Sequence, residues 1–181
     1  MNLPNKITFL RVLMIPLYLI VYLARPLSET PNMWLALVIF AAASITDAID
    51  GYVARKYKLV TNFGKLMDPL ADKLLVSAAL IAFTATGALP AWAVVLMISR
   101  EFYITGLRQL AIEQGTVLAA SGWGKFKTAM QITLVIYILL PIPFFKFDWI
   151  ITGLLIITIL ASVFSAVDYT VKNKQVFVAK D

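Results

Sequence analysis

Residues 33–57 read MWLALVIFAAASITDAIDGYVARKY, and this stretch decides both the fold and the chemistry. Its first part is an apolar run of the kind that crosses the hydrocarbon core of a bilayer as a helix. Two aspartates, Asp47 and Asp50, follow in the same helical segment, and a glycine and basic residues come soon after them. Acidic side chains are costly inside a membrane and are usually functional there. The stretch therefore predicts a membrane helix with a site near its end.

The composition of the whole chain is that of an integral membrane protein. Of its 181 residues, 61% are hydrophobic and 14% are charged, which is more apolar surface than a soluble domain of this length needs. The net charge of +6 is typical of cytoplasmic loops, and no basic stretch with interleaved aromatic residues suggests a nucleic-acid partner. The first apolar run is too long for a signal peptide and lacks a small-residue cleavage site.

Two residue types are absent from the chain, cysteine and histidine. Their absence removes disulfides, thiolate nucleophiles, imidazole bases and zinc sites of the Cys/His kind. A bound metal ion would need oxygen ligands, which favours Mg²⁺, Mn²⁺ or Ca²⁺, and a general base would be a carboxylate, a lysine or a tyrosine.

Six apolar segments predict six transmembrane helices, at about 6–25, 33–54, 66–86, 90–110, 126–144 and 149–170. The glycine-containing segment 113–127 predicts a loop before the fifth helix. No internal repeat or soluble domain is evident. We therefore expect an all-α integral membrane protein, with residues 1–181 forming a single six-helix transmembrane catalytic domain.

The distribution of basic residues predicts the orientation of these helices. Eleven of the sixteen lysines and arginines fall on one face, which the positive-inside rule makes cytoplasmic: Lys6, Arg55, Lys56, Lys58, Lys65, Arg108, Lys125, Lys127, Lys172, Lys174 and Lys180. The opposite face receives only Arg25 and Lys146. Both termini and the acidic end of the second helix are therefore expected on the cytoplasmic side of a multi-pass protein of the cell membrane.

The third predicted helix repeats the acidic pattern of the second. Helical spacing places each set on one stripe: Asp47, Asp50, Gly51 and Ala54 at i, i+3, i+4 and i+7, and Gly64, Asp68 and Asp72 at i, i+4 and i+8. Two adjacent antiparallel helices could thus aim four carboxylates at one point near the cytoplasmic surface. Without counter-charge these groups would repel, so one or two divalent cations are the natural partner, which suggests phosphoryl chemistry.

Other interpretations of these acids stay open at this point. Asp47 and Asp50 can be polar residues of helix packing or partners of Lys73 and Arg100. Asp68 precedes Pro69 and can be a helix N-cap. A cation transporter could use all four acids as an ion path, although they gather at one end and no inverted repeat is visible.

The residues read D-x2-D-G-x2-A-R-x8-G-x3-D-x3-D, a pattern filled by Asp47, Asp50, Gly51, Ala54, Arg55, Gly64, Asp68 and Asp72. Every defined position resembles the signature of the CDP-alcohol phosphotransferase family, and the six-helix layout is similar over nearly the whole chain. LPNKITFLRVLMIPLYL near the N-terminus, ISREFYITGLRQLAIEQG in the fourth helix and GKFKT after the long loop resemble the phosphatidylglycerophosphate synthase branch.

The resemblance implies a reaction and a set of roles. CDP-diacylglycerol and sn-glycerol 3-phosphate would give phosphatidylglycerophosphate and CMP, with Mg²⁺ or Mn²⁺ at a two-metal site and a homodimer as the common assembly. Asp47, Asp50 and Asp68 would be metal ligands, and Asp72, beside the metals, would be the catalytic base. A pocket for the nucleotide and its diphosphate would be lined by Gly51, Ala54, Arg55 and Gly64.

An acceptor that carries a phosphate also needs cations. The candidates near the cytoplasmic half of the chain are Thr8, Arg11, Arg100, Arg108 and Lys125. Arg100 can instead pair with an intramembrane acid such as Glu101 across a helix–helix contact, and Arg11 can snorkel to the surface. Arg108 and Lys125 can be ordinary positive-inside residues. Serine, inositol phosphate and phosphatidylglycerol remain alternative acceptors.

Overall fold

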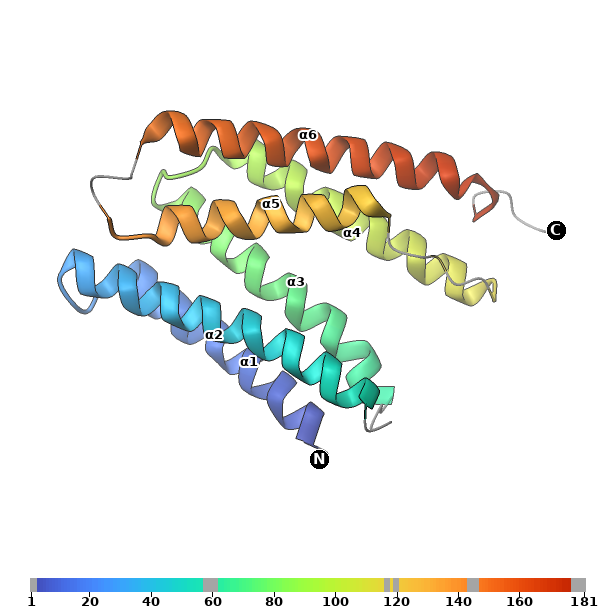
Figure 1. Cartoon of the computed structure of the whole chain (residues 1–181), viewed down its shortest axis with the longest axis horizontal. Helices are drawn as coiled ribbons and strands as arrows, with labels where there is room; N and C mark the ends of the chain where they lie inside the picture. Colours follow the sequence, from blue (N-terminus) through green and yellow to red (C-terminus); the bar gives the residue numbers. More distant parts are fainter. Residues whose placement is uncertain (1–2, 57–61, 116–117, 119–120, 143–146, 177–181) are drawn as a thin grey trace. The chain divides into compact units, whose positions relative to one another are not determined.

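The computed structural model describes residues 3–56, 62–115, 118, 121–142 and 147–176, except for the side chains of 3–8, 47–56, 62–72 and 175. Six long helices run through these ranges: α1 (Leu3–Leu19), α2 (Glu29–Lys56), α3 (Asn62–Ala85), α4 (Ala91–Glu113), α5 (Gly122–Leu139) and α6 (Asp148–Lys172) (Figure 1). Two short helical segments, η1 (Ile20–Ala24) and η3 (Lys174–Val176), follow α1 and α6. The described ranges contain no strand, so the all-α prediction is confirmed.

The fifth helix differs most from its predicted bounds. It was expected over 126–144, but α5 spans Gly122–Leu139. Ser121 explains the earlier start, because its hydroxyl accepts a hydrogen bond from the backbone N–H of Gly124 at 3.1 Å and so caps the helix despite two glycines. Pro141 lacks an N–H and disfavours helical geometry in the residue before it, which accounts for the earlier end.

One helix, α6, is long and apolar enough to cross a membrane by its length and composition. Two shorter apolar stretches, Phe9–Ala24 and Lys73–Ala85, adjoin segments whose side chains are outside the described set. The six predicted helices are present in the structure. That all six cross the membrane, and that both termini are cytoplasmic, stays a prediction.

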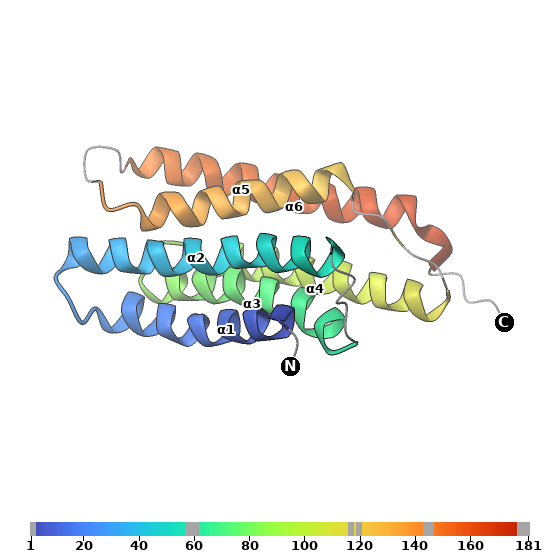
Figure 2. The ribbon, with the colours of Figure 1, turned by 60° about the horizontal axis from the view of Figure 1, so that its bottom comes forward.

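The chain divides into two compact units, which we describe separately. The N-terminal unit contains α1, η1, α2 and α3, and α1 packs against both of the other long helices. Alanines at the contacts, including Ala36, Ala43 and Ala79, are fully buried and let the helix backbones approach closely. The N-terminal end of α1 lies at the same end of this unit as the C-terminal end of α2 and the N-terminal end of α3 (Figures 1 and 2).

Aromatic rings fill the other end of the N-terminal unit. Tyr22 stacks on Tyr18 at 5.9 Å between ring centroids and meets the edge of Phe83 at 5.3 Å. The Tyr22 hydroxyl and the Thr86 hydroxyl are hydrogen-bonded at 3.0 Å. Tyr22 lies in η1, a turn of π-helix, and the Asn32 side chain donates a hydrogen bond to the Val21 carbonyl in the same turn. These contacts fix the α1–α2 connection against the end of α3.

The C-terminal unit contains α4, α6 and nearly all of α5. Helices α4 and α6 contact each other, and Ile104, Leu107 and Tyr169 form a small buried cluster against which Leu118 packs. The Gln114 side chain donates a hydrogen bond to the Val176 carbonyl at 3.2 Å, which ties η3 to the end of α4. Polar side chains, described below, connect α5 to the other two helices.

The aromatic cluster generates a stability prediction. Phe83→Ala is expected to lower the free energy of unfolding by about 3–5 kcal/mol, because it leaves a cavity beside Tyr22 in a fully buried site. Thermal unfolding in detergent would measure the loss. The matched control is Ile81→Ala on the same helix, where the side chain is 57% exposed and a loss below about 1 kcal/mol is expected. Similar losses in both variants would contradict the assigned core.

Candidate functional site

The aspartate motif spans the end of one helix and the start of the next. Asp47 and Asp50 lie in α2, and Asp68 and Asp72 lie in α3, and these two helices contact each other in the N-terminal unit. The backbone is helical through all four positions, as the predicted stripes require. The remaining motif positions are on the same two helices: Gly51, Ala54 and Arg55 on α2, and Gly64 on α3. The side chains of all eight residues lie outside the described set, so their roles stay predictions.

The donor set of this motif suits a hard divalent cation. Four carboxylates on two contacting helices offer only oxygen atoms, and the chain has no histidine or cysteine that would favour a softer metal. Among the side chains that the structure describes, no group of three acidic, histidine or cysteine residues is close enough to hold a metal ion. The fit to Mg²⁺ or Mn²⁺ therefore rests on the chemistry of the donors and on the helical backbone that carries them.

The first helix brings a cation into the N-terminal unit. Arg11 of α1 is 1% exposed, which is the opposite of the exposed head group that snorkelling requires. Helix α1 begins at the end of the unit where α2 ends and α3 starts (Figure 2). The backbone at Thr8 lies one helical turn before Arg11, and its side chain is outside the described set.

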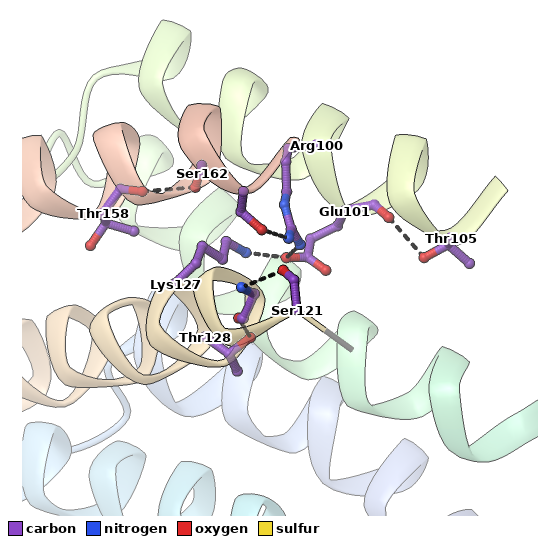
Figure 3. Close-up of polar contacts among 10 residues, drawn as sticks. Arg100, Glu101, Thr105, Ser121, Lys127, Thr128, Thr158 and Ser162 are labelled. Carbon is purple, nitrogen blue, oxygen red and sulfur yellow. Dashed lines mark hydrogen bonds and ion pairs between the residues drawn. The ribbon is translucent and has the colours of Figure 1, made fainter. Parts of the chain in front are cut away.

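A cluster of charged and hydroxyl side chains occupies the C-terminal unit (Figure 3). One carboxylate oxygen of Glu101 accepts from Arg100 Nη1 at 3.2 Å and also pairs with Lys127 Nζ. The Lys127 side chain is 1% exposed, so its charge is compensated inside the protein rather than by water. The other terminal nitrogen of Arg100, Nη2, donates to the hydroxyl of Ser165. Three helices thus meet around one acid.

The expected pairing of Arg100 with Glu101 is present, but the pair forms within α4 itself. The contact that joins two helices is the one between Lys127 of α5 and Glu101 of α4. Lys127 was predicted to lie on the cytoplasmic side with the other basic residues, and that side stays a prediction. The structure adds that its side chain is buried among the helices.

Arg108 lies two turns after Arg100 on α4 and is held by an aromatic residue of α6. Its Nε donates to the hydroxyl of Tyr169 at 3.1 Å, and its Cζ lies 5.6 Å from the centre of that ring. The hydroxyl of Thr105, three residues before Arg108, donates a hydrogen bond to the Glu101 backbone carbonyl at 2.7 Å. Lys125, on the first turn of α5, is exposed, in contrast to the partly buried Arg108.

Three residues of this cluster were not predicted to belong to a functional site: Lys127, Ser165 and Tyr169. A periodic signal was available for each. On α5, Lys127, Gln131, Leu134 and Ile138 are all buried and follow the helical repeat. On α6, Thr158, Ser162, Ser165 and Tyr169 form a similar buried stripe. Polar side chains on a buried stripe indicate that the helix packs against polar side chains of a neighbouring helix.

Comparison with known proteins supplies a family. The chain matches the CDP-alcohol phosphatidyltransferase family over residues 1–167. It is 50% identical over 154 residues, 79% of each chain, to a CDP-diacylglycerol–glycerol-3-phosphate 3-phosphatidyltransferase of Bacillus subtilis (strain 168). It is 40% identical over 141 residues to a probable phosphatidylglycerophosphate synthase of Mycobacterium tuberculosis (strain H37Rv), covering 78% of this chain and 67% of the relative. A Haemophilus influenzae CDP-diacylglycerol–glycerol-3-phosphate 3-phosphatidyltransferase is 40% identical over 137 residues, 72% of this chain and 71% of its own.

The buried ion pair predicts a large difference between two lysines of one helix. Lys127→Met is expected to lower the free energy of unfolding by about 1.5–3 kcal/mol, because it removes one of the cations that pair with the Glu101 carboxylate, while Arg100 remains. Lys125→Met removes the same charge from an exposed site two residues away and should cost no more than about 0.5 kcal/mol. Thermal unfolding of both variants in detergent tests this, and equal stability of the two would contradict a structural role for the pair.

Proposed function

The chain belongs to the CDP-alcohol phosphatidyltransferase family, and on that basis we propose that it transfers a phosphatidyl group from CDP-diacylglycerol to sn-glycerol 3-phosphate. The products are phosphatidylglycerophosphate and CMP. The observation that carries the proposal is the 50% identity, over 79% of both chains, to a Bacillus subtilis enzyme named for this activity. Because the relatives are named as transferases, they favour an enzyme over a cation transporter.

In the proposed reaction, the acceptor hydroxyl oxygen forms a bond to the phosphorus that carries the diacylglycerol. The phosphoanhydride bond to CMP breaks, and CMP leaves with the electron pair. We assign Asp72 as the general base that takes the hydroxyl proton, since the chain has no histidine for that task. Its position on α3 is one helical turn after Asp68, so helical spacing puts the two aspartates on one stripe.

The other motif residues are proposed to bind the donor. Asp47, Asp50 and Asp68, with Asp72 beside them, would hold two Mg²⁺ or Mn²⁺ ions, which supply charge neutralisation of the diphosphate and polarisation of the phosphorus when bound. Gly51 and Gly64 lack side chains and would let the nucleotide approach the helix backbones closely. Ala54 is equally small, and Arg55 would complement the charge of the diphosphate.

The acceptor phosphate is assigned to the arginines of α4. Arg108 is the stronger candidate, because among the described residues its terminal Nη groups have no hydrogen-bond or ion-pair partner and its Nε has only a neutral one. Arg100 adds a second cation, although it shares Glu101 with Lys127. Thr8, Arg11 and Lys125 remain proposed contributors from α1 and α5.

The same proposal includes the setting of the enzyme. We propose a multi-pass protein of the cytoplasmic membrane, with both termini and the active site on the cytoplasmic side, in contact with lipid and assembled as a homodimer. An active site just below the membrane surface suits a donor whose acyl chains stay in the bilayer while its nucleotide is polar. A single catalytic domain is supported by the family match, which extends over helices of both compact units.

A substitution of the proposed base tests the chemistry. Asp72→Asn should lower kcat for CMP release from CDP-diacylglycerol and glycerol 3-phosphate by about 10²–10⁴-fold, because the amide cannot accept the proton. The control is Asp148→Asn, which removes an exposed carboxylate in the first turn of α6 and should leave kcat unchanged. Near-full activity of a folded Asp72→Asn enzyme would refute the assignment.

A second substitution tests the identity of the acceptor. Arg108→Ala should raise KM for glycerol 3-phosphate about tenfold or more, because a charge-assisted contact to phosphate is lost, and it should leave KM for CDP-diacylglycerol unchanged. A panel of glycerol 3-phosphate, serine, inositol phosphate and phosphatidylglycerol, with CMP as the readout, would be run on the unsubstituted enzyme beside it. Turnover with serine alone and an unchanged KM in Arg108→Ala would exclude the phosphate-bearing acceptor.

A further inference from the structure

We propose that one face of α6, formed by Ser165 and Tyr169, is a positioning surface that orients Arg100 and Arg108 of α4 toward one shared anion. The inference rests on the proposed function, in which that anion is the phosphate of the acceptor. Neither α6 residue belongs to the aspartate motif, and we assign neither of them a contact with the substrate. They act through the arginines.

The contact between Ser165 and Arg100 is buried and bordered by α5. Ser165 is fully buried, and its hydroxyl accepts from Arg100 Nη2. Gly124 of α5 closes the other side, since a Cβ placed there would lie 3.5 Å from Arg100 Nη2 and 3.6 Å from Ser165 Oγ. Glu101 holds the opposite terminal nitrogen, Nη1. The plane of the guanidinium is therefore fixed by two partners and a close backbone.

Tyr169 fixes Arg108 in a similar way with two contacts. The hydroxyl accepts from Nε at 3.1 Å, and the ring lies under the guanidinium at 5.6 Å. Because Nε is the inner nitrogen of the group, this contact leaves both terminal nitrogens directed away from the tyrosine hydroxyl. These terminal nitrogens are the pair that binds a phosphate through two parallel hydrogen bonds.

The four residues place both arginines against one face of α6. Arg100 and Arg108 are eight residues apart, about 12 Å along α4, whereas Ser165 and Tyr169 are four apart, about 6 Å along α6. Each arginine bonds to its own α6 partner, and these partners lie on successive turns of that helix. The two guanidinium groups are close enough for their like charges to interact.

Two like charges on one face are unfavourable unless anions compensate them. Glu101 compensates part of the charge of Arg100 but also pairs with Lys127, so a bound phosphate would relieve the repulsion that remains between the arginines. The partners on α6 are also neutral hydroxyls. A carboxylate at either position would hold the arginine more strongly but would cancel the charge that a phosphate needs. Hydroxyl acceptors fix the direction of the guanidinium and leave its charge in place.

Removal of the α6 hydroxyls tests the proposal. Tyr169→Phe and Ser165→Ala should each raise KM for glycerol 3-phosphate about three- to tenfold, the usual worth of one such hydrogen bond. The values of kcat and of KM for CDP-diacylglycerol should change less than about twofold, because the chemical step does not use these residues. Ser165→Thr restores the hydroxyl and should return KM toward that of the unsubstituted enzyme.

The chain offers a matched control for each variant. Tyr103→Phe also removes a tyrosine hydroxyl that joins α4 to α6, but its bond is to Thr170 at 2.8 Å and not, among the described side chains, to an arginine. Ser162→Ala removes a buried α6 hydroxyl that donates to the Thr158 carbonyl of its own helix. Both should keep KM for glycerol 3-phosphate unchanged. An equal rise of this KM in the controls would mean that Ser165 and Tyr169 only contribute to helix packing, and it would overturn the proposal.

A double substitution separates this inference from the proposed function. If Tyr169 acts through Arg108, adding Tyr169→Phe to Arg108→Ala should raise KM no further than Arg108→Ala does alone. Independent, multiplicative effects would overturn the positioning role. An Arg108→Ala effect without any Tyr169→Phe or Ser165→Ala effect would sink this inference and leave the proposed function intact. Absence of CMP release by the unsubstituted enzyme would refute the proposed function itself.

Discussion

The carboxylate of Glu101 is the group around which the C-terminal unit is organised. It compensates Lys127 and part of the charge of Arg100, which lowers the free-energy cost of burying Lys127 in a helix as apolar as α5. The pair also sets how α5 is rotated and shifted against α4, because an ion pair tolerates less displacement than a contact between aliphatic side chains. Gly124, Arg100 and Ser165 come together as a result of that register. In this unit an ion pair therefore helps to set the register between two helices, a role that apolar packing has in the N-terminal unit.

The N-terminal unit solves its packing in a different way. Stacked and edge-on rings of Tyr18, Tyr22 and Phe83, together with fully buried alanines, hold its three helices together. These contacts lie toward the end of the unit that contains the α1–α2 connection, whereas the acidic motif lies where α2 ends and α3 starts. Rigid packing at one end and charged residues at the other allow the helices to carry a costly cluster of acids without relying on it for stability.

The sequence predicts the helices well because long apolar runs separated by turn residues leave few alternatives. It fails at the start of α5, where two glycines indicate a loop and only the cap by Ser121 makes helix favourable. The positive-inside rule assigned Lys127 only to a side of the membrane, although its spacing from Gln131 and Leu134 agrees with a buried stripe. The sequence motif identifies the four aspartates, but the structure does not describe their side chains. The pairs formed by Ser165 and Tyr169 with the arginines depend on how α6 lies against α4, and no periodicity within one helix contains that information.

A turn of π-helix takes up one residue more than the α-helical turn it replaces. Ile20–Ala24 is therefore the place where α1 can absorb a change in chain length, since loss of one residue there restores the regular repeat. Loss of a residue earlier in α1 would instead rotate the helix face on one side of the gap by about 100° relative to the other and separate Arg11 from its buried setting. Homologous chains that differ by a single residue in this region are thus expected to align with their gap at Ile20–Ala24. In such chains the side chain at the position of Asn32 would be released from its contact with the Val21 carbonyl and free to vary.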